Sequence, residues 1–254
     1  MDFFDDILTA TYLKKASLSL LLDGLPQSVP QSYTSGKEML AAALTGRIRT
    51  DASMLRQGAK NATEGANIAT LIATSTSTVR DNLNQMLTLA QEVKADPTKG
   101  SVNGAAFTAL AGELSSVASG TKYNNISLLN KNGWTNDSRL TVSGDGKSST
   151  FTLQMGYGSS TFTLNDLSYL DYLKGVDLSS GSLDVNALIS DLSTQINTVN
   201  VIYSRNNSLS GSYTSEAKVL VEQAGILDKA AKDAMPSEED PLLRDIGSII
   251  STKS

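Results

Sequence analysis

The sequence predicts a mainly α-helical fold: an elongated rod of long antiparallel coiled-coil-like helices with a small β-hairpin region. Two long stretches of the 254 residues carry apolar side chains at alternating steps of four and three, the spacing of helices that pack along a supercoiled partner. Between them, β-branched and polar residues alternate around an Asp-Gly step, which is typical of a hairpin.

Four of the five prolines stand near the two ends of the chain, as the pairs Pro26 with Pro30 and Pro236 with Pro241. A proline inside a helix removes a backbone hydrogen bond and clashes with the preceding turn, so each pair marks a break or hinge. We therefore expect terminal helices over 2–23 and 241–254. The chain then divides into an N-terminal helix with its linker, a central rod domain, and a C-terminal linker with its helix, over residues 1–35, 36–234 and 235–254.

The first long helix is predicted over residues 36–94, where Ala, Leu and Thr are frequent and Pro97 follows. One face of this stretch forms a seam made mostly of alanine, with the residues Leu55, Ala59, Ala62, Ala66, Ala69 and Ala73. Small side chains allow two helices to approach closely. Past Thr76 the apolar face becomes wider, which suits packing against more than one neighbour.

A second helix is predicted over residues 103–119, where apolar residues keep helical spacing and Gly120 is suited to end the helix. It should fold back as an antiparallel partner of the first helix. A β-hairpin region is predicted over 138–165, because short strand patterns flank Asp145 and Gly146, a residue pair that favours tight turns.

The return helix is predicted over residues 183–234 and shows the clearest periodicity in the chain. Its seam comprises Val185, Ile189, Leu192, Ile196, Val199, Tyr203, Asn206, Ser210, Tyr213, Ala217, Leu220, Ala224, Leu227 and Ala231. A period of 3.5 residues kept over this length indicates supercoiling with other helices rather than an ordinary globular helix. The polar centre, from Asn206 to Gly211, favours a polar layer or a local kink.

Composition argues against several classes of function. The chain has no Cys and no His, which removes thiolate nucleophiles, the usual general base near neutral pH and the commonest transition-metal ligand. We therefore predict no catalytic residues, cofactor or metal site. The formal charge of −5 and the lack of a basic stripe argue against nucleic acid. We expect neither a cleaved secretion signal nor a membrane span, since the N-terminus is acidic and no apolar stretch reaches the necessary length.

A series of motifs follows the order of these elements. Residues 61–69 read Asn-Ala-x-x-Gly-x-x-Ile-Ala within a longer stretch from Arg56 to Ala69, and Leu83 and Leu89-Ala90 follow on the same helix. Next come Gly120-Thr121-Lys122-Tyr123-Asn124, the hairpin pattern of 150–164 and the apolar spacing of 191–207. Taken in this order, the motifs resemble those of the bacterial flagellin family, over roughly residues 36–232.

The resemblance implies a minimal flagellin-like protein that lacks outer variable domains, because only about ten residues, 174–183, separate the hairpin from the return helix. It also implies a secreted structural protein of the bacterial flagellum or a flagellum-like filament that serves motility. Its partners would be further copies of itself, together with the flagellar export apparatus and a chaperone. The terminal segments depart from the family, since they are short and separated from the rod by prolines.

Self-assembly is predicted to run through the two terminal segments, each of which carries one apolar stripe at helical spacing. The predicted assembly residues are Phe3, Phe4, Ile7, Leu8, Leu18, Leu242, Leu243, Ile246, Ile249 and Ile250. A helix of ~14 residues is marginal alone in water, so we expect these ends to become ordered on assembly. Head-to-tail contacts that do not close into a ring would then produce an open filament.

Four alternatives stay open from the residues. The chain could be a non-polymerising junction or adaptor homologue of the same export system, or a monomeric helical bundle whose seams are simply its core. The terminal segments could also pack on their own chain, or the first could serve only as an export signal. A hydrolase built on a helical rod is disfavoured by the absence of His.

Overall fold

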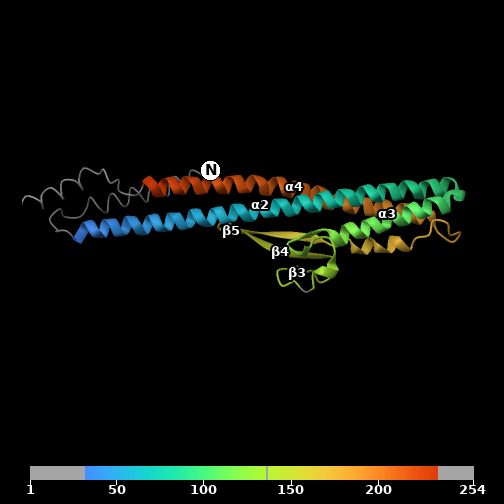
Figure 1. Ribbon diagram of the computed structural model, residues 1–254, viewed down its shortest axis with the longest axis horizontal. Helices are drawn as coiled ribbons and strands as arrows, with labels where there is room; N and C mark the ends of the chain where they lie inside the picture. Colours follow the sequence, from blue (N-terminus) through green and yellow to red (C-terminus); the bar gives the residue numbers. More distant parts are fainter. Residues whose placement is uncertain (1–31, 136, 234–254) are drawn as a thin grey trace, which may run out of the picture. The chain divides into compact units, whose positions relative to one another are not determined.

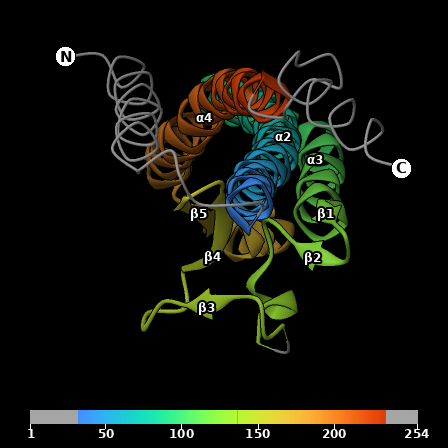
Figure 2. The same ribbon diagram turned by 90° about the vertical axis from the view of Figure 1, so that its left-hand side faces the viewer.

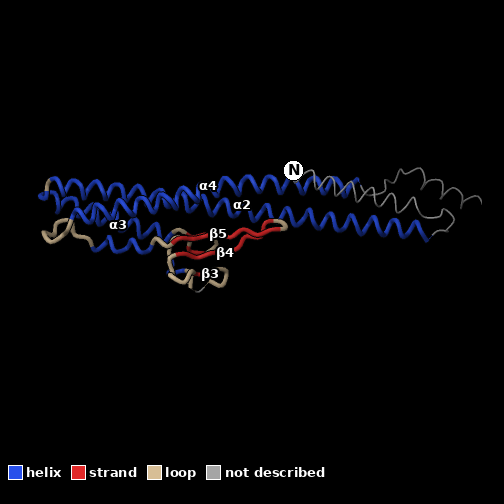
Figure 3. The backbone as a smooth tube through the Cα atoms, turned by 180° about the vertical axis from the view of Figure 1, so that it is seen from behind, coloured by secondary structure: helices blue, strands red, loops and turns tan. Residues whose placement is uncertain are grey.

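The computed structural model describes residues 32–135 and 137–233. The chain divides into two compact units, Met1–Ile48 with Ala230–Ser254, and Arg49–Lys229. Most described residues are helical, and they are accompanied by small antiparallel sheets (Figure 3). The predicted mainly α class with a hairpin region is therefore confirmed. The terminal helices expected over 2–23 and 241–254 lie outside the described residues.

Three long helices account for most of the described chain. They are α2 (Ser32–Ala95), α3 (Gly100–Gly120) and α4 (Val185–Asp233), and their bounds differ by one to four residues from those predicted. The polar caps explain where two of the elements begin. The carboxylate of Asp184 accepts hydrogen bonds from the backbone N–H groups of Asn186 and Ala187, each at 3.0 Å, and so caps α4. Asp96 likewise caps the short 3₁₀ helix η1 (Pro97–Lys99), which joins α2 to α3.

Within the unit Arg49–Lys229, α2 and α4 pack side by side in opposite directions (Figure 1). Arg56 forms an ion pair with Asp228. Farther along α2, the hydroxyl groups of Thr70 and Ser210 lie 2.7 Å apart. Farther still, the Arg80 guanidinium lies 4.9 Å from the centre of the Tyr203 ring. Residue numbers thus rise on α2 as they fall on α4, which defines an antiparallel pair.

The helix α3 packs antiparallel against the C-terminal part of α2. The Asn103 side-chain amide donates to the carboxylate of Glu92 at 3.1 Å and to the backbone carbonyl of Leu89 at 3.3 Å. At the other end of α3, the hydroxyl of Thr121 donates to that of Ser75 at 3.0 Å. Figure 2, in which the helices point towards the viewer, shows α2 between α3 and α4, with β4 and β5 beneath it.

Two small antiparallel sheets follow α3. The first pairs β1 (Lys122–Tyr123) with β2 (Ile126–Ser127), and the second has the order β3 (Thr141–Val142), β4 (Ser148–Met155) and β5 (Gly158–Asn165). The turn between β1 and β2 places Asn124 and Asn125 at φ values of 46° and 66°, as a two-residue type I′ turn requires. Gly156 has a φ of 59° at the first central position of the β4–β5 turn, where a type II′ turn favours glycine.

The β4–β5 hairpin has one apolar and one polar face, because side chains alternate along each strand. Met155, Phe162 and Leu164 are buried, whereas Thr152 and Thr161, which are cross-strand partners, are exposed on the other face. The Phe151 and Phe162 rings stack with their centroids 5.1 Å apart. The buried face joins the same hydrophobic core as the seam of α2.

Two further 3₁₀ helices, η2 (Lys131–Gly133) and η3 (Ser168–Gly175), complete the described chain. The buried carboxylate of Asp166 links them, because it accepts hydrogen bonds from the backbone N–H groups of Lys131 at 3.1 Å and Ser168 at 2.9 Å. Trp134 is also buried, and its indole N–H donates to the carbonyl of Ser127 at 2.8 Å. Polar groups that are buried in this way are satisfied by hydrogen bonds.

Candidate functional site

The predicted seam residues of the two long helices lie at or beside the core. On α2, the residues Leu55, Ala59, Ala62, Ala66, Ala69 and Ala73 are all buried. On α4, Leu192, Val199 and Leu220 are buried, while Ile189, Ile196, Tyr203 and Leu227 are partly buried. The predicted assembly residues Phe3, Phe4, Ile7, Leu8, Leu18, Leu242, Leu243, Ile246, Ile249 and Ile250 fall outside the described residues.

The return helix carries a fully buried polar side chain at its centre. Asn206 is 0% exposed, and its amide nitrogen donates to the backbone carbonyl of Ile202 at 2.8 Å, one turn earlier on α4. Its amide oxygen is buried without a hydrogen-bond partner. A polar residue at such a position costs stability, and in helical assemblies it can fix the register of the helices.

The backbones of α2 and the hairpin approach each other closely at Gly58. A Cβ atom at Gly58 on α2 would lie only 2.1 Å from the backbone nitrogen of Gly156, in the β4–β5 turn. No side chain fits in that space, so Gly58 permits the hairpin to approach the helix directly. The two glycines are therefore required for different reasons: one by a close approach and the other by its positive φ.

Side chains from both long helices hold the hairpin. The Asn61 amide of α2 donates to the carbonyl of Gln154 on β4 at 2.6 Å. From α4, the Arg205 guanidinium donates to the carbonyl of Thr163 on β5 at 3.2 Å. Gln154 and Thr163 occupy the non-hydrogen-bonded positions of the strand pair, so both carbonyls point away from the partner strand. The hairpin is thus tied to α2 along one strand and to α4 along the other.

Tyr213 of α4 adds an aromatic contact to this attachment. Its ring stacks on Phe162 with the centroids 6.0 Å apart, and its hydroxyl lies 3.0 Å from that of Ser160. Tyr213 is buried, so its ring contributes apolar packing while its hydroxyl has a hydrogen-bond partner in Ser160. The predicted seam residue Tyr213 therefore contacts the hairpin.

A second cluster joins η3 to the first turns of α4. The Tyr169 hydroxyl donates to the side-chain oxygen of Gln195 at 2.8 Å, and the Tyr172 hydroxyl donates to the carboxylate of Asp191. Burial, followed by the nearby charges of Asp166 and Asp191, raises the pKa of Tyr169 to about 12. Burial and the hydrogen bond to Asp191 also raise the pKa of Tyr172. Both phenols therefore stay neutral near physiological pH.

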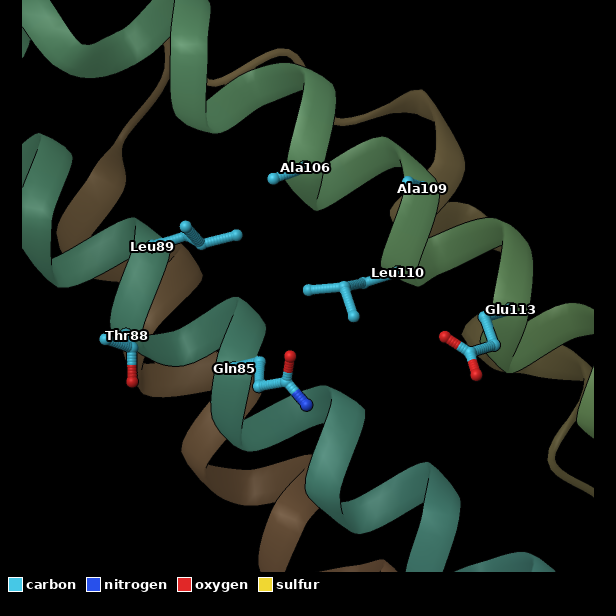
Figure 4. Close-up of a pocket in the computed structure, with 7 residues that line it drawn as sticks. All are labelled: Gln85, Thr88, Leu89, Ala106, Ala109, Leu110 and Glu113. Carbon is cyan, nitrogen blue, oxygen red and sulfur yellow. The ribbon is translucent and has the colours of Figure 1, made fainter.

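An open groove of ≈ 510 Å³ runs between α2 and α3 (Figure 4). Gln85, Thr88 and Leu89 line it from α2, and Ala106, Ala109, Leu110 and Glu113 line it from α3. Figure 4 shows the Leu89 and Leu110 side chains pointing into the space between the two helices, with Glu113 at one end. The lining is mostly apolar, and Glu113 is its one charged member.

Within 32–135 and 137–233, no group of three or more acidic side chains is placed to hold a metal ion. No helix in these ranges is long and apolar enough to cross a membrane. The strongest local electrostatic effect on a carboxyl group is at Asp137, where hydrogen bonds from the Arg139 side chain and backbone lower the pKa to about 2. Arg139 is exposed and Asp137 is partly buried, and both lie in the loop before β3.

Several of these residues were not anticipated from the sequence. Gly58 and Asn61 fall within a family-like motif, yet no local pattern indicates that they contact the hairpin. The groove was also missed, because its two walls come from separate helices. The buried seam of α3 masked a second stripe on that helix, where Val102, Ala106, Ala109 and Glu113 recur at steps of four, three and four.

No protein-family model matches the chain, and no curated protein matches it significantly. The resemblance to flagellins therefore stays a prediction that rests on the order of the motifs and of the structural elements.

Proposed function

We propose that this chain is a structural, non-enzymatic subunit of a flagellar-type extracellular filament, which self-assembles through its terminal segments after export. In this proposal α2 and α4 form part of an elongated coiled-coil-like rod, and the partners of each copy are other copies. The export apparatus and a chaperone would act before assembly.

The antiparallel pairing of α2 with α4 is the observation that carries the proposal. Helix α2 has 64 residues and α4 has 49, and within Arg49–Lys229 they pair along a seam that is made mostly of alanine on the α2 side. Such a pair offers length and stiffness, which suits a structural element. The element order, with a second helix, a Tyr-Asn turn and a hairpin between the two long helices, is the order that the resemblance to flagellins implies.

The terminal stripes supply the driving force in this proposal. Apolar side chains at helical spacing, such as Ile7 and Ile246, would leave water when they meet those of neighbouring copies. Burying one large aliphatic side chain contributes ~1.5–3 kcal/mol. Several such residues in each terminus, repeated in every copy, would favour the polymer over the free subunit.

Negative-stain microscopy of the full chain, after assembly is induced by salt or temperature, tests the proposal. We expect long filaments. The substitution Ile246→Asp places a charge on the apolar stripe and should abolish them, whereas Ser248→Asp, on the opposite side of the same predicted helix, should leave filaments intact. Removing residues 1–25 provides a second test, because filaments formed by that shortened chain would contradict assembly through both termini.

The adaptor alternative gives a different result in the same experiment. A junction or adaptor protein would stay monomeric or form short caps under every condition that induces assembly. If both variants form filaments equally well, the structural role remains supported, but assembly through the terminal stripes is contradicted.

A further inference from the structure

The exposed side of α3 has the pattern of a helix that contacts another helix. Val102, Ala106, Ala109 and Glu113 lie on one face at alternating steps of four and three, and all four are exposed. Val102 is 77% exposed, more than any other large hydrophobic residue in the described part of the chain. Glu113 is the only charged residue in the helix. Solvent-facing helical stripes are normally polar, so this stripe differs from an ordinary surface, and part of it forms the α3 wall of the groove.

The C-terminal part of α4 presents a stripe with the same spacing. Val219, Glu222, Ile226 and Lys229 recur at steps of three, four and three, and all are exposed. Val219 is 41% exposed and Ile226 is 42% exposed. We call these four residues the α4 stripe. It combines two aliphatic side chains and the carboxylate of Glu222 with a positive charge at its end, whereas the groove combines aliphatic side chains with a negative charge at one end.

The groove and the α4 stripe cannot meet within one copy of the chain. Asp228 pairs with Arg56, so the end of the stripe lies level with the early part of α2. Thr121 bonds Ser75, and because α3 is antiparallel to α2, Glu113 lies about two turns beyond Ser75. The two charges are therefore separated by nearly 30 residues along α2, or ~40 Å at the rise of an α-helix. Contact between these surfaces requires two copies.

We propose that the α4 stripe of one copy docks in the α2–α3 groove of the next copy. This inference rests on the proposed function, and it identifies a contact between copies in the described part of the chain. Both α3 and α4 run antiparallel to α2, so they are parallel to each other. Copies related by a shift along α2 keep these directions, and α4 of one copy then lies parallel to α3 of its neighbour.

One register pairs Lys229 with Glu113 and also brings aliphatic side chains together. If Lys229 lies beside Glu113 of the neighbour, a parallel arrangement places Ile226 beside Leu110 and Val219 beside Val102, because the spacings agree to within one residue. The contact joins two different surfaces of the chain and moves each copy ~40 Å along the helices. Such a heterologous contact with a large translation does not close into a ring, and it extends as an open assembly.

Cysteine crosslinking tests this contact directly, because the natural chain has no Cys. One full-length variant carries Val102→Cys and a second carries Val219→Cys, and the two are mixed under assembly conditions with a short thiol-reactive crosslinker. We expect a crosslinked dimer from the mixture. Each single variant alone should give little, since neither surface meets itself in the proposed contact.

A matched control uses Val201→Cys mixed with Val102→Cys. Val201 is 67% exposed and lies on the same face of α4 as Val219, but it is 18 residues away, or ~27 Å. Equal crosslinking of Val102→Cys with both α4 positions would overturn the proposal. Efficient crosslinking of Val102→Cys to itself would also overturn the proposal, because the groove of one copy would then face α3 of the next copy instead of α4.

Charge exchange provides an independent measurement. Glu113→Lys and Lys229→Glu should each raise the critical concentration for assembly ~2–5-fold, the size of effect expected for one exposed ion pair, and the double variant should recover most of the loss. Non-recovery in the double variant would contradict the register. If filaments form but the Val102–Val219 crosslink does not, the proposed contact is wrong and the proposed function stands. If the crosslink forms but filaments do not, the contact is supported and the filament function is contradicted.

Discussion

Replacing Gly58 with alanine should detach the β4–β5 hairpin from α2, although alanine is the better helix former. The added Cβ would lie 2.1 Å from the nitrogen of Gly156, 2.8 Å from its Cα and 2.9 Å from the carbonyl carbon of Met155. All three are backbone atoms of a tight turn, so no side chain can rotate away. The hairpin as a whole must move by more than an ångström to restore a normal contact.

The change in the free energy of unfolding combines two destabilising effects and one stabilising effect. Overpacking costs ~1–3 kcal/mol, and loss of the bond from Asn61 to the carbonyl of Gln154 costs ~1 kcal/mol. Against this, alanine in a helix interior gains ~1 kcal/mol over glycine. The net expectation is a loss of ~1–3 kcal/mol, which lowers the melting temperature by ~2–12 °C for a chain of this size.

Thermal unfolding followed by circular dichroism measures the loss, and Gly211→Ala is the matched control. Gly211 lies in α4, and a Cβ there would meet nothing within 4 Å, so that substitution should raise the melting temperature slightly. Hydrogen exchange should show faster exchange in β4 and β5 of Gly58→Ala, with α4 unchanged. A Gly58→Ala variant at least as stable as Gly211→Ala would refute the close approach.

Three further predictions follow from buried or charged groups. The pKa of Asp137 is lowered from 3.8 to about 2. Its ion pair with Arg139 therefore stabilises the loop at pH values above 3.8, and this stability is lost as the pH falls towards 2. In Arg139→Gln, an NMR titration should find the pKa of Asp137 raised towards 3.8. The pKa of Tyr169 is raised to about 12. The neutral phenol therefore contributes stability below pH 10, and this stability is lost as the pH rises through about 12. Asp191→Asn should lower the pH at which half of the Tyr169 phenolate absorbance has developed. Asn206→Leu removes a buried amide oxygen without a partner and should stabilise the chain by ~1 kcal/mol, measured by denaturant unfolding; a lower stability would mean that the amide is needed for packing.

The sequence predicted the long elements well because their signals are local and repeated. The four-three alternation runs through many turns of α2 and α4, so a single exception such as Asn206 does not hide it. The end of the first long helix was also readable, since Pro97 closely follows its last residue, Ala95. The Asp145-Gly146 step correctly marked a turn, in which Gly146 has a φ of 67°.

The eight-residue 3₁₀ helix η3 was missed, although a signal for it exists. Leu167, Leu170 and Leu173 recur at every third residue and are buried, which is the period of a 3₁₀ helix rather than of an α-helix. Contacts between distant segments have no such signal. Gly58 and Gly156 meet across almost a hundred residues, and nothing in either local pattern indicates the other. The groove could not be predicted for the same reason, because its two walls come from separate helices.

The attachment of the hairpin has a consequence for how this chain can associate with other chains. Strands at the rim of a small sheet present unpaired backbone groups, which invite strand addition and amyloid-like stacking. Here Asn61 occupies the outward carbonyl of Gln154 and Arg205 occupies that of Thr163, while β3 pairs with the first part of β4. With these backbone groups occupied, the helical surfaces are the favoured route for association with other chains.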